Sequence, residues 1–308
     1  MSNPLITVAL CTYNPRADYL ERTLEGVRRQ TLPQEEWEFL LIDNCSQPPL
    51  DGRVDLAGLP KARIVVEKEP GLSHARRRAF QEAKGELIVN LDDDVVLNPD
   101  YLAQAKKIAL EKPFLGVCGC QVKPEFEAPP IRPPAEYYGA ERKVPQAVWS
   151  SDPEHYASNP WGLGSVLKRD VALAYAAKIS KDPRFSVVGR KPGKLFACED
   201  DDIAMTACDL GLGKGVFPEL KVTHLIPKTR MTDEFQIKNA QGKGYSATML
   251  AFLRQGRLPA PRGLLARLNR LYRLSRMSPR RRAEERAIDE GVKEAVRDLQ
   301  KWGWLRPN

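Results

Sequence analysis

Three consecutive carboxylates follow an apolar run of strand length. Leu87–Leu91 has the apolar character of a strand buried on both faces, and Asp92, Asp93 and Asp94 come directly after it. Adjacent aspartates repel one another unless a cation or solvent screens them. The triplet taken alone is typical of a solvated acidic turn. At the carboxyl end of a parallel strand it would suit a divalent cation that carries phosphates.

Two other segments carry groups of similar chemistry. Four acids, Glu199–Asp202, open a predicted helix, and His224 lies at the end of a predicted strand. An oxygen-rich set with one imidazole suits Mn²⁺ or Mg²⁺ better than Zn²⁺. Each group also has a simpler interpretation. Acids favour a helix N-terminus electrostatically, and a lone histidine is commonly a hydrogen-bonded core residue.

The elements that position these groups alternate along the chain. Strands are predicted at residues 5–11, 37–42, 64–66, 87–91, 115–122, 161–167 and 216–225, and helices at 17–30, 73–84, 99–112, 171–177 and 199–211. This alternation predicts an α/β protein whose parallel sheet carries helices on its faces. Residues 123–160 are rich in proline and are predicted to form a long irregular segment.

Composition limits the class of protein. The chain has 308 residues, of which 42% are hydrophobic and 29% charged, as is typical of soluble globular proteins. Six scattered cysteines lack zinc-site spacing, which favours buried thiols in a reducing compartment. The N-terminal residues lack the pattern of a signal peptide, so we expect a cytoplasmic protein.

The net charge of +8 belongs to the C-terminal tail, because residues 254–308 alone carry +9. A helix predicted near residues 262–282 places leucines and a tyrosine on one half of its surface and arginines on the other. Such a helix can lie on an anionic bilayer as a peripheral contact. The alternative is that the leucines pack on the body of the protein and the arginines are solvated.

The order of motifs resembles that of family 2 glycosyltransferases, in particular bacterial polysaccharide members. The matching segments are Thr12–Asn14, Leu41–Ser46, Gly71–Arg76, residues 92–94, Cys198–Asp200 and Val222–Arg230. The resemblance implies the GT-A fold (nucleotide-diphospho-sugar transferase, Rossmann-like). This is an α/β fold with a mixed, mostly parallel sheet, helices on both faces and, here, a C-terminal helical tail. The implied domains are a catalytic domain at 1–250 and the tail at 251–308. The catalytic domain divides into a nucleotide-binding half, 1–122, and an acceptor-binding half, 123–250.

The resemblance also implies roles for individual residues. Those implied for the nucleotide-sugar are Thr12, Tyr13, Asn14, Asp43, Arg76, Asp92, Asp93 and Arg230. Asp94 and His224 would hold the metal, and Trp161 would contact the acceptor. Asp200 would be the catalytic base, with Glu199 shaping the site; Asp201 and Asp202 leave the base uncertain by one residue. Many family members have Asn after the arginine, where Arg77 follows here.

The activity implied by the resemblance is inverting, metal-dependent transfer of a sugar. Mn²⁺ or Mg²⁺ would be the cofactor, a UDP-sugar the favoured donor, and a saccharide or lipid-linked molecule the acceptor. A nucleotidyltransferase of similar fold is an alternative, but those enzymes usually carry a Gly-rich loop where this chain has Thr12–Pro15. A non-enzymatic nucleic-acid-binding protein is another. We expect no nucleic acid, because the basic tail offers few aromatic side chains for stacking.

Overall fold

The computed structural model describes residues 5–190, 195, 198–258 and 263–305. The chain forms two compact units. The first comprises Met1–Ser186 and Glu199–Lys228, and the second Val187–Cys198 and Thr229–Asn308.

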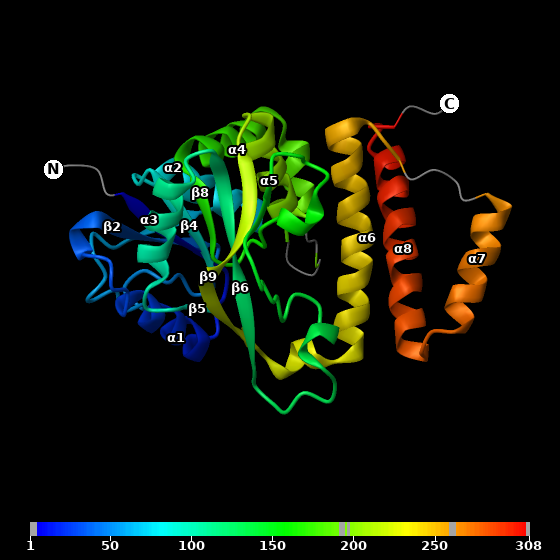
Figure 1. Ribbon diagram of the computed structural model, residues 1–308, viewed down its shortest axis with the longest axis horizontal. Coiled ribbons are helices and arrows are strands. Elements are labelled where there is room, and N and C mark those ends of the chain that lie inside the picture. Colours follow the sequence, from blue (N-terminus) through cyan, green and yellow to red (C-terminus); the bar gives the residue numbers. More distant parts are fainter. Residues whose placement is uncertain (1–4, 191–194, 196–197, 259–262, 306–308) are drawn as a thin grey trace. The chain divides into compact units, whose positions relative to one another are not determined.

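The first unit is built on one sheet. In the described residues it has nine strands in the order β3-β2-β1-β4-β8-β6-β9-β5, with β7 paired to β9 (Figure 1). The strands are β1 (Ile6–Thr12), β2 (Trp37–Asn44), β3 (Arg63–Glu67), β4 (Leu87–Asp92), β5 (Val95–Leu97), β6 (Leu115–Phe126), β7 (Val148–Ser150), β8 (Ser165–Lys168) and β9 (Gly213–Ile226). Strands β3, β2, β1 and β4 run parallel, as does β6 with β9. Strands β8, β5 and β7 pair antiparallel with their neighbours, so the sheet is mixed.

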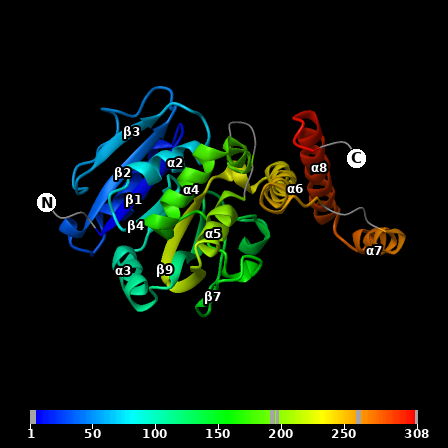
Figure 2. The same cartoon turned by 90° about the horizontal axis from the view of Figure 1, so that it is seen from above.

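Helices cover both faces of this sheet, as expected. Helices α2, α4 and α5 pack on one face of the sheet and α3 on the other (Figure 2). Helix α1 shares the core cluster of α3 and so covers the same face as α3. The helices are α1 (Ala17–Arg28), α2 (Leu72–Glu82), α3 (Tyr101–Glu111), α4 (Arg169–Lys181) and α5 (Glu199–Asp209). Because each face is covered, every residue of β1 and β2 is buried, and these strands show no polar alternation.

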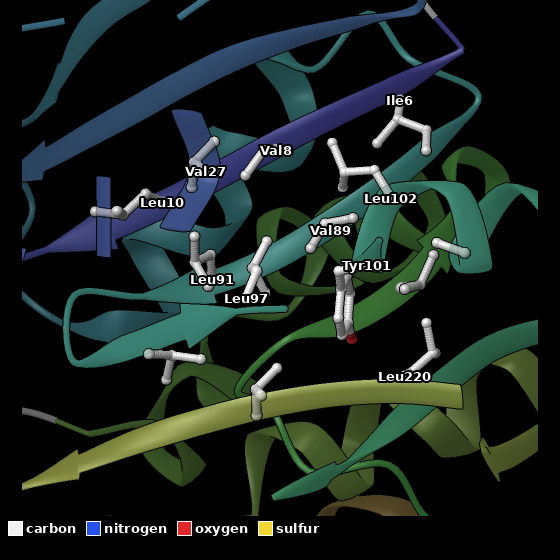
Figure 3. Packing of buried hydrophobic residues seen from close by; sticks show 14 of the residues in the cluster. Ile6, Val8, Leu10, Val27, Val89, Leu91, Leu97, Tyr101, Leu102 and Leu220 are labelled. Carbon is white, nitrogen blue, oxygen red and sulfur yellow. The ribbon is translucent and has the colours of Figure 1, made fainter. Parts of the chain in front are cut away.

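The main hydrophobic core lies between the sheet and the α1/α3 layer. Figure 3 shows alternate residues of β1, from Ile6 to Leu10, meeting Val89 and Leu91 of β4. Tyr101 of α3 is fully buried in the same cluster. Burying apolar area on this scale is the main stabilising contribution to the unit, at about 25 cal/mol per Å².

Residues 161–167, predicted to be one strand, divide into a tight loop and the short strand β8. Gly164 has φ 72°, a left-handed conformation that favours glycine, so the extended backbone does not begin until Ser165. The proline-rich segment is largely irregular, as predicted, although β7 lies within it. This segment and the loop at 161–164 flank the candidate site.

The second unit is helical. Its helices are α6 (Asp233–Gln255), α7 (Leu264–Ser275) and α8 (Pro279–Lys301). Helices α6 and α8 lie side by side (Figure 1) and approach at glycines. A Cβ on Gly291 would lie 2.0 Å from the carbonyl oxygen of Gln241. The domain boundary expected at residue 250 falls inside α6, which packs with α8.

Within the described ranges, none of the helices has both the length and the apolar character needed to span a bilayer. The six cysteines, all among the described residues, form no disulfide, and four of them are buried. Burial raises the pKa of Cys118 and Cys120 to about 12, so these thiols stay protonated and behave as small apolar side chains.

Candidate active site

Three parallel strands end together at one edge of the sheet. Thr12 at the end of β1 is paired in register with Asp43 of β2, and Cys11 is paired with Asp92 of β4. The Thr12 hydroxyl donates a hydrogen bond to Asp93. The carboxyl ends of neighbouring parallel strands therefore gather these side chains, which lie far apart in the sequence.

Asp43 and Asn14 organise the loop that follows β2. The buried carboxylate of Asp43 accepts hydrogen bonds from the backbone N–H groups of Ser46, at 3.0 Å, and Leu50, at 2.9 Å. The side-chain oxygen of Asn14 accepts from the N–H of Gln47 at 2.7 Å. Tyr13 projects beside them with 48% of its surface exposed, so its ring is open to a ligand.

Arg76 is a buried cation at the centre of this edge. It lies in the first turn and a half of α2, and only 3% of its surface is exposed. Its guanidinium is 3.4 Å from Asp92 and 3.4 Å from Glu199. Burial alone would lower the arginine pKa, but the attraction of Glu199 and Asp92 outweighs it and raises the pKa. Arg76 therefore stays charged and joins the end of β4 to the start of α5.

Glu199 is buried and faces Arg76. Its carboxylate accepts a hydrogen bond from the Tyr175 hydroxyl at 3.2 Å, and 3% of the residue is exposed. Burial raises the pKa of Glu199 to about 7, with Arg76 opposing and Asp200 adding to the rise. Near neutral pH Glu199 thus exchanges a proton at the junction of α4, α2 and α5.

This raised pKa makes stability depend on pH. Between its ordinary pKa of 4.5 and about 7, the folded chain holds a proton on Glu199 that the unfolded chain releases. The free energy of unfolding therefore falls as pH rises through this window. Glu199→Gln keeps the shape of the side chain but cannot titrate. We expect the free energy of unfolding of this variant to decrease by about 2 to 4 kcal/mol less than that of the parent over the same pH range.

Urea unfolding of both proteins from pH 5 to pH 8 measures this difference. Glu35→Gln, at an exposed position, is the control and should keep the parent's slope. If the free energy of unfolding changed with pH in the same way for the parent and for Glu199→Gln, the proposed proton uptake by Glu199 would be excluded.

Asp200 is the carboxylate of its run that contacts the loop before β8. It accepts hydrogen bonds from the N–H of Gly162 and from the N–H of Asp201, both at 3.1 Å. Asp201 is bonded by the Asn159 amide at 2.6 Å, and fully buried Asp202 pairs with Lys178 at 2.7 Å. Asp201 and Asp202 thus tie α5 to Asn159 and Lys178, whereas Asp200 contacts the Gly162 loop and lies close enough to Arg76 to raise the pKa of that arginine.

Gly162 packs the loop against the buried arginine. A Cβ at this position would lie 2.7 Å from an Arg76 nitrogen, and the Gly162 carbonyl accepts from the Asn90 amide at 2.8 Å. Trp161, the expected acceptor residue, stacks with Arg142, whose guanidinium carbon is 5.3 Å from the ring centroid.

Three further residues position this site, namely Gly162, Asn90 and Tyr175. Asn90 offered a signal, since it is a polar residue inside the otherwise apolar run of β4. Tyr175 and Gly162 offered none, because their roles come from contacts between distant segments.

Asp94 and His224, the two residues expected to hold a metal, lie close together. Both are buried, and His224 Nε2 lies 3.7 Å from an Asp94 oxygen, because β5 and β9 pair Val95 with His224. His224 Nδ1 is 3.1 Å from the Gly139 carbonyl, which can only accept, so this nitrogen carries the proton. With Nε2 unprotonated, His224 would turn that nitrogen's lone pair toward the Asp94 carboxylate, an arrangement that favours a cation between them.

The pair fits a metal ion whose remaining coordination positions would be filled by phosphate oxygens and water. Two donors about 2.1 Å from one cation lie about 3 to 4 Å apart. In the described parts of the chain, no group of three or more His, Cys, Asp or Glu side chains is gathered for a metal. Mg²⁺ and Mn²⁺ sites that bind substrate phosphates commonly use only one or two protein carboxylates.

Arg230 belongs to the second compact unit, whereas the other expected site residues belong to the first. Its carbonyl accepts a hydrogen bond from the Gln236 side chain at 2.7 Å. Its role toward a donor stays a prediction.

A family model described as "Glycosyl transferase family 2" matches residues 7–166, slightly more than half of the chain. An uncharacterized protein of Sinorhizobium fredii, y4gI, is 38% identical over 105 residues, which cover 33% of this chain and 11% of that one. The putative teichuronic acid biosynthesis glycosyltransferase TuaG of Bacillus subtilis is 30% identical over 115 residues, covering 35% and 43%. The chain thus spans less than half the length of these curated relatives.

The fold has a solved counterpart. The mannosyltransferase PcManGT from Pyrobaculum calidifontis, in complex with GDP-Man and Mn²⁺, superposes with a TM-score of 0.56 at 19% identity. The match covers 96% of this chain and 88% of that one. At this identity the likeness establishes the GT-A fold and leaves the substrates open.

Proposed function

The chain belongs to glycosyl transferase family 2, and from that premise we propose that it is an inverting, metal-dependent transferase. It would move a sugar from a nucleoside-diphosphate donor to a saccharide or lipid-linked acceptor in surface polysaccharide or glycolipid synthesis. The observation that carries the proposal is the gathering of Asp92, Arg76, Glu199 and Asp200 at one edge of the sheet.

The donor would bind along the ends of β1, β2 and β4. Tyr13, which follows the residue paired with Asp43, offers an exposed ring for the base, and Asp92 is suited to accept from a ribose hydroxyl. Arg76 lies near the N-terminus of α2, where both its charge and the helix dipole favour a diphosphate. Asp94 and His224 would hold Mn²⁺ or Mg²⁺, which neutralises charge on the leaving diphosphate.

Asp200 would take the proton from the acceptor hydroxyl as the new bond forms on the opposite face of the sugar. A carboxylate suits this step because it is ionised at neutral pH. The Gly162 N–H holds one of its oxygens, and Trp161, next in sequence, would present an aromatic face to the acceptor. The enzyme would act in the cytoplasm, where nucleotide sugars are made.

A thermal-shift screen of nucleotide sugars with and without Mn²⁺ tests the proposal. A ligand that binds the native state at 100 times its Kd stabilises it by about 2.7 kcal/mol. We expect at least one donor, with UDP-sugars favoured, to raise the Tm more in the presence of Mn²⁺ than in its absence.

GDP-mannose belongs in the same screen, because the structural counterpart binds it. Inorganic pyrophosphate is the control, since a protein that merely binds anions would respond to it equally. Release of pyrophosphate in place of nucleoside diphosphate during turnover would identify a nucleotidyltransferase and refute the proposal.

A further inference from the structure

Helix α7 turns its arginine side toward α8. Arg270 is 13% exposed at its side chain, and its guanidinium contacts Glu285 at 3.4 Å and also Asp289. Arg273 lies 3.5 Å from the same glutamate. The side of α7 that faces its neighbour in the second unit is therefore charged, which is the reverse of an ordinary amphipathic helix packing on a core.

The opposite side of α7 presents an exposed apolar surface. It consists of Leu264 (73% exposed), Leu265 (82%), Leu268 (53%), Leu271 (64%) and Tyr272 (61%). These positions follow helical spacing and share one face of the helix. Single exposed leucines are common in soluble proteins, but five adjacent large side chains on one helix mark a binding surface.

The surroundings of this apolar surface carry positive charge. Arg276 is exposed and donates a hydrogen bond to the Tyr272 hydroxyl at 2.8 Å, so its charge lies at the rim of the leucine surface. No Asp or Glu occurs in the sequence from Arg254 to Arg282. A second copy of the chain would bring an equally basic rim to the same place, and like charges would oppose the contact.

We propose that the exposed face of α7 docks on an anionic lipid bilayer. The leucines and Tyr272 enter the headgroup and acyl boundary, while Arg276 at the rim contacts the lipid phosphates. The inference is independent of the transfer reaction, because it uses only the second unit and requires no substrate.

Co-sedimentation of the full chain with vesicles tests the proposal. We expect binding to phosphatidylcholine vesicles that contain about one third phosphatidylglycerol, and much weaker binding to phosphatidylcholine alone. Leu268→Glu should weaken binding to the anionic vesicles about tenfold or more, because it places a carboxylate in the apolar face. Arg276→Gln should weaken it about fivefold and reduce its dependence on salt.

Two matched controls separate α7 from general surface effects. Leu110→Glu changes a leucine that is 70% exposed on α3, and Arg53→Gln removes an exposed charge elsewhere. Both should bind vesicles as the parent does, and circular dichroism should be unchanged in all four variants.

Absence of binding to anionic vesicles, or equal losses in the α7 variants and the controls, would overturn the proposal. Sedimentation velocity gives the other contrary result. A dimer that Leu268→Glu converts to monomers would show that this face pairs two copies of the chain instead.

Discussion

Asp200→Asn is expected to lower the transfer rate by about 10²- to 10⁴-fold while leaving donor affinity nearly unchanged. Asparagine keeps the size of the side chain and can still accept the hydrogen bond from the Gly162 N–H. It cannot take up the proton of the acceptor hydroxyl. Steady-state rates of nucleoside diphosphate release, together with donor titrations by calorimetry, separate the two effects.

Asp201→Asn is the matched control, because it changes the neighbouring carboxylate by the same single atom. Asp201 pairs with Asn159 and holds the start of α5, so we expect a small loss of stability and transfer within about tenfold of the parent. If Asp200→Asn transferred sugar at the parental rate, Asp200 would not be the catalytic base. If Asp201→Asn folded normally but lost transfer, Asp201 would be the better candidate for the base.

Asp94→Asn is expected to abolish most of the metal-dependent part of donor binding, with a loss of about 100-fold in donor affinity at saturating Mn²⁺. The variant replaces a charged oxygen ligand beside His224 with a neutral amide. The measurement is the Tm shift that MnCl₂ produces in the presence of nucleoside diphosphate, which does not depend on turnover. His224→Gln should reduce the same shift.

Asp51→Asn, at an exposed loop position, controls for general effects of charge and should keep the full shift. Chelation by EDTA should abolish transfer by the parent, and adding Mn²⁺ or Mg²⁺ should restore it. Transfer that is indifferent to EDTA, or an Asp94→Asn variant with an unchanged Mn²⁺ shift, would remove the metal from the proposed reaction.

The contacts of Arg76 with its carboxylates explain why Glu199→Gln and Asp200→Asn should change different properties of the protein. Arg76 stays charged because Glu199 and Asp92 surround it in a buried site, so it can meet a diphosphate without a change of protonation. Glu199, with its pKa raised to about 7, is the group of this cluster that responds to pH. Stability in the neutral range should therefore follow Glu199, and catalysis Asp200.

The amino-acid sequence predicted most strands and helices of the first unit and the acidic side chains at their ends. The apolar run before Asp92 predicted a buried strand, and the alternation of strands and helices predicted the α/β sheet with helices on both faces. These inferences succeeded because burial on both faces and helical periodicity are written in neighbouring residues. The order of the motifs indicated the family, which the family match to residues 7–166 supports.

The partner of each acid and the exposed face of α7 could not be predicted from sequence, because both depend on contacts made in the folded chain. Four consecutive acids look alike in sequence, but the fold gives them different partners. Lys178 pairs with Asp202, the Asn159 amide bonds Asp201, and the Gly162 N–H bonds Asp200. The leucines of α7 were equally compatible with a packed face or a bilayer. Their exposure follows from Glu285 and Asp289 of α8, which draw the arginine side inward. These features depend on contacts between separate segments of the chain, and a local sequence pattern cannot predict such contacts.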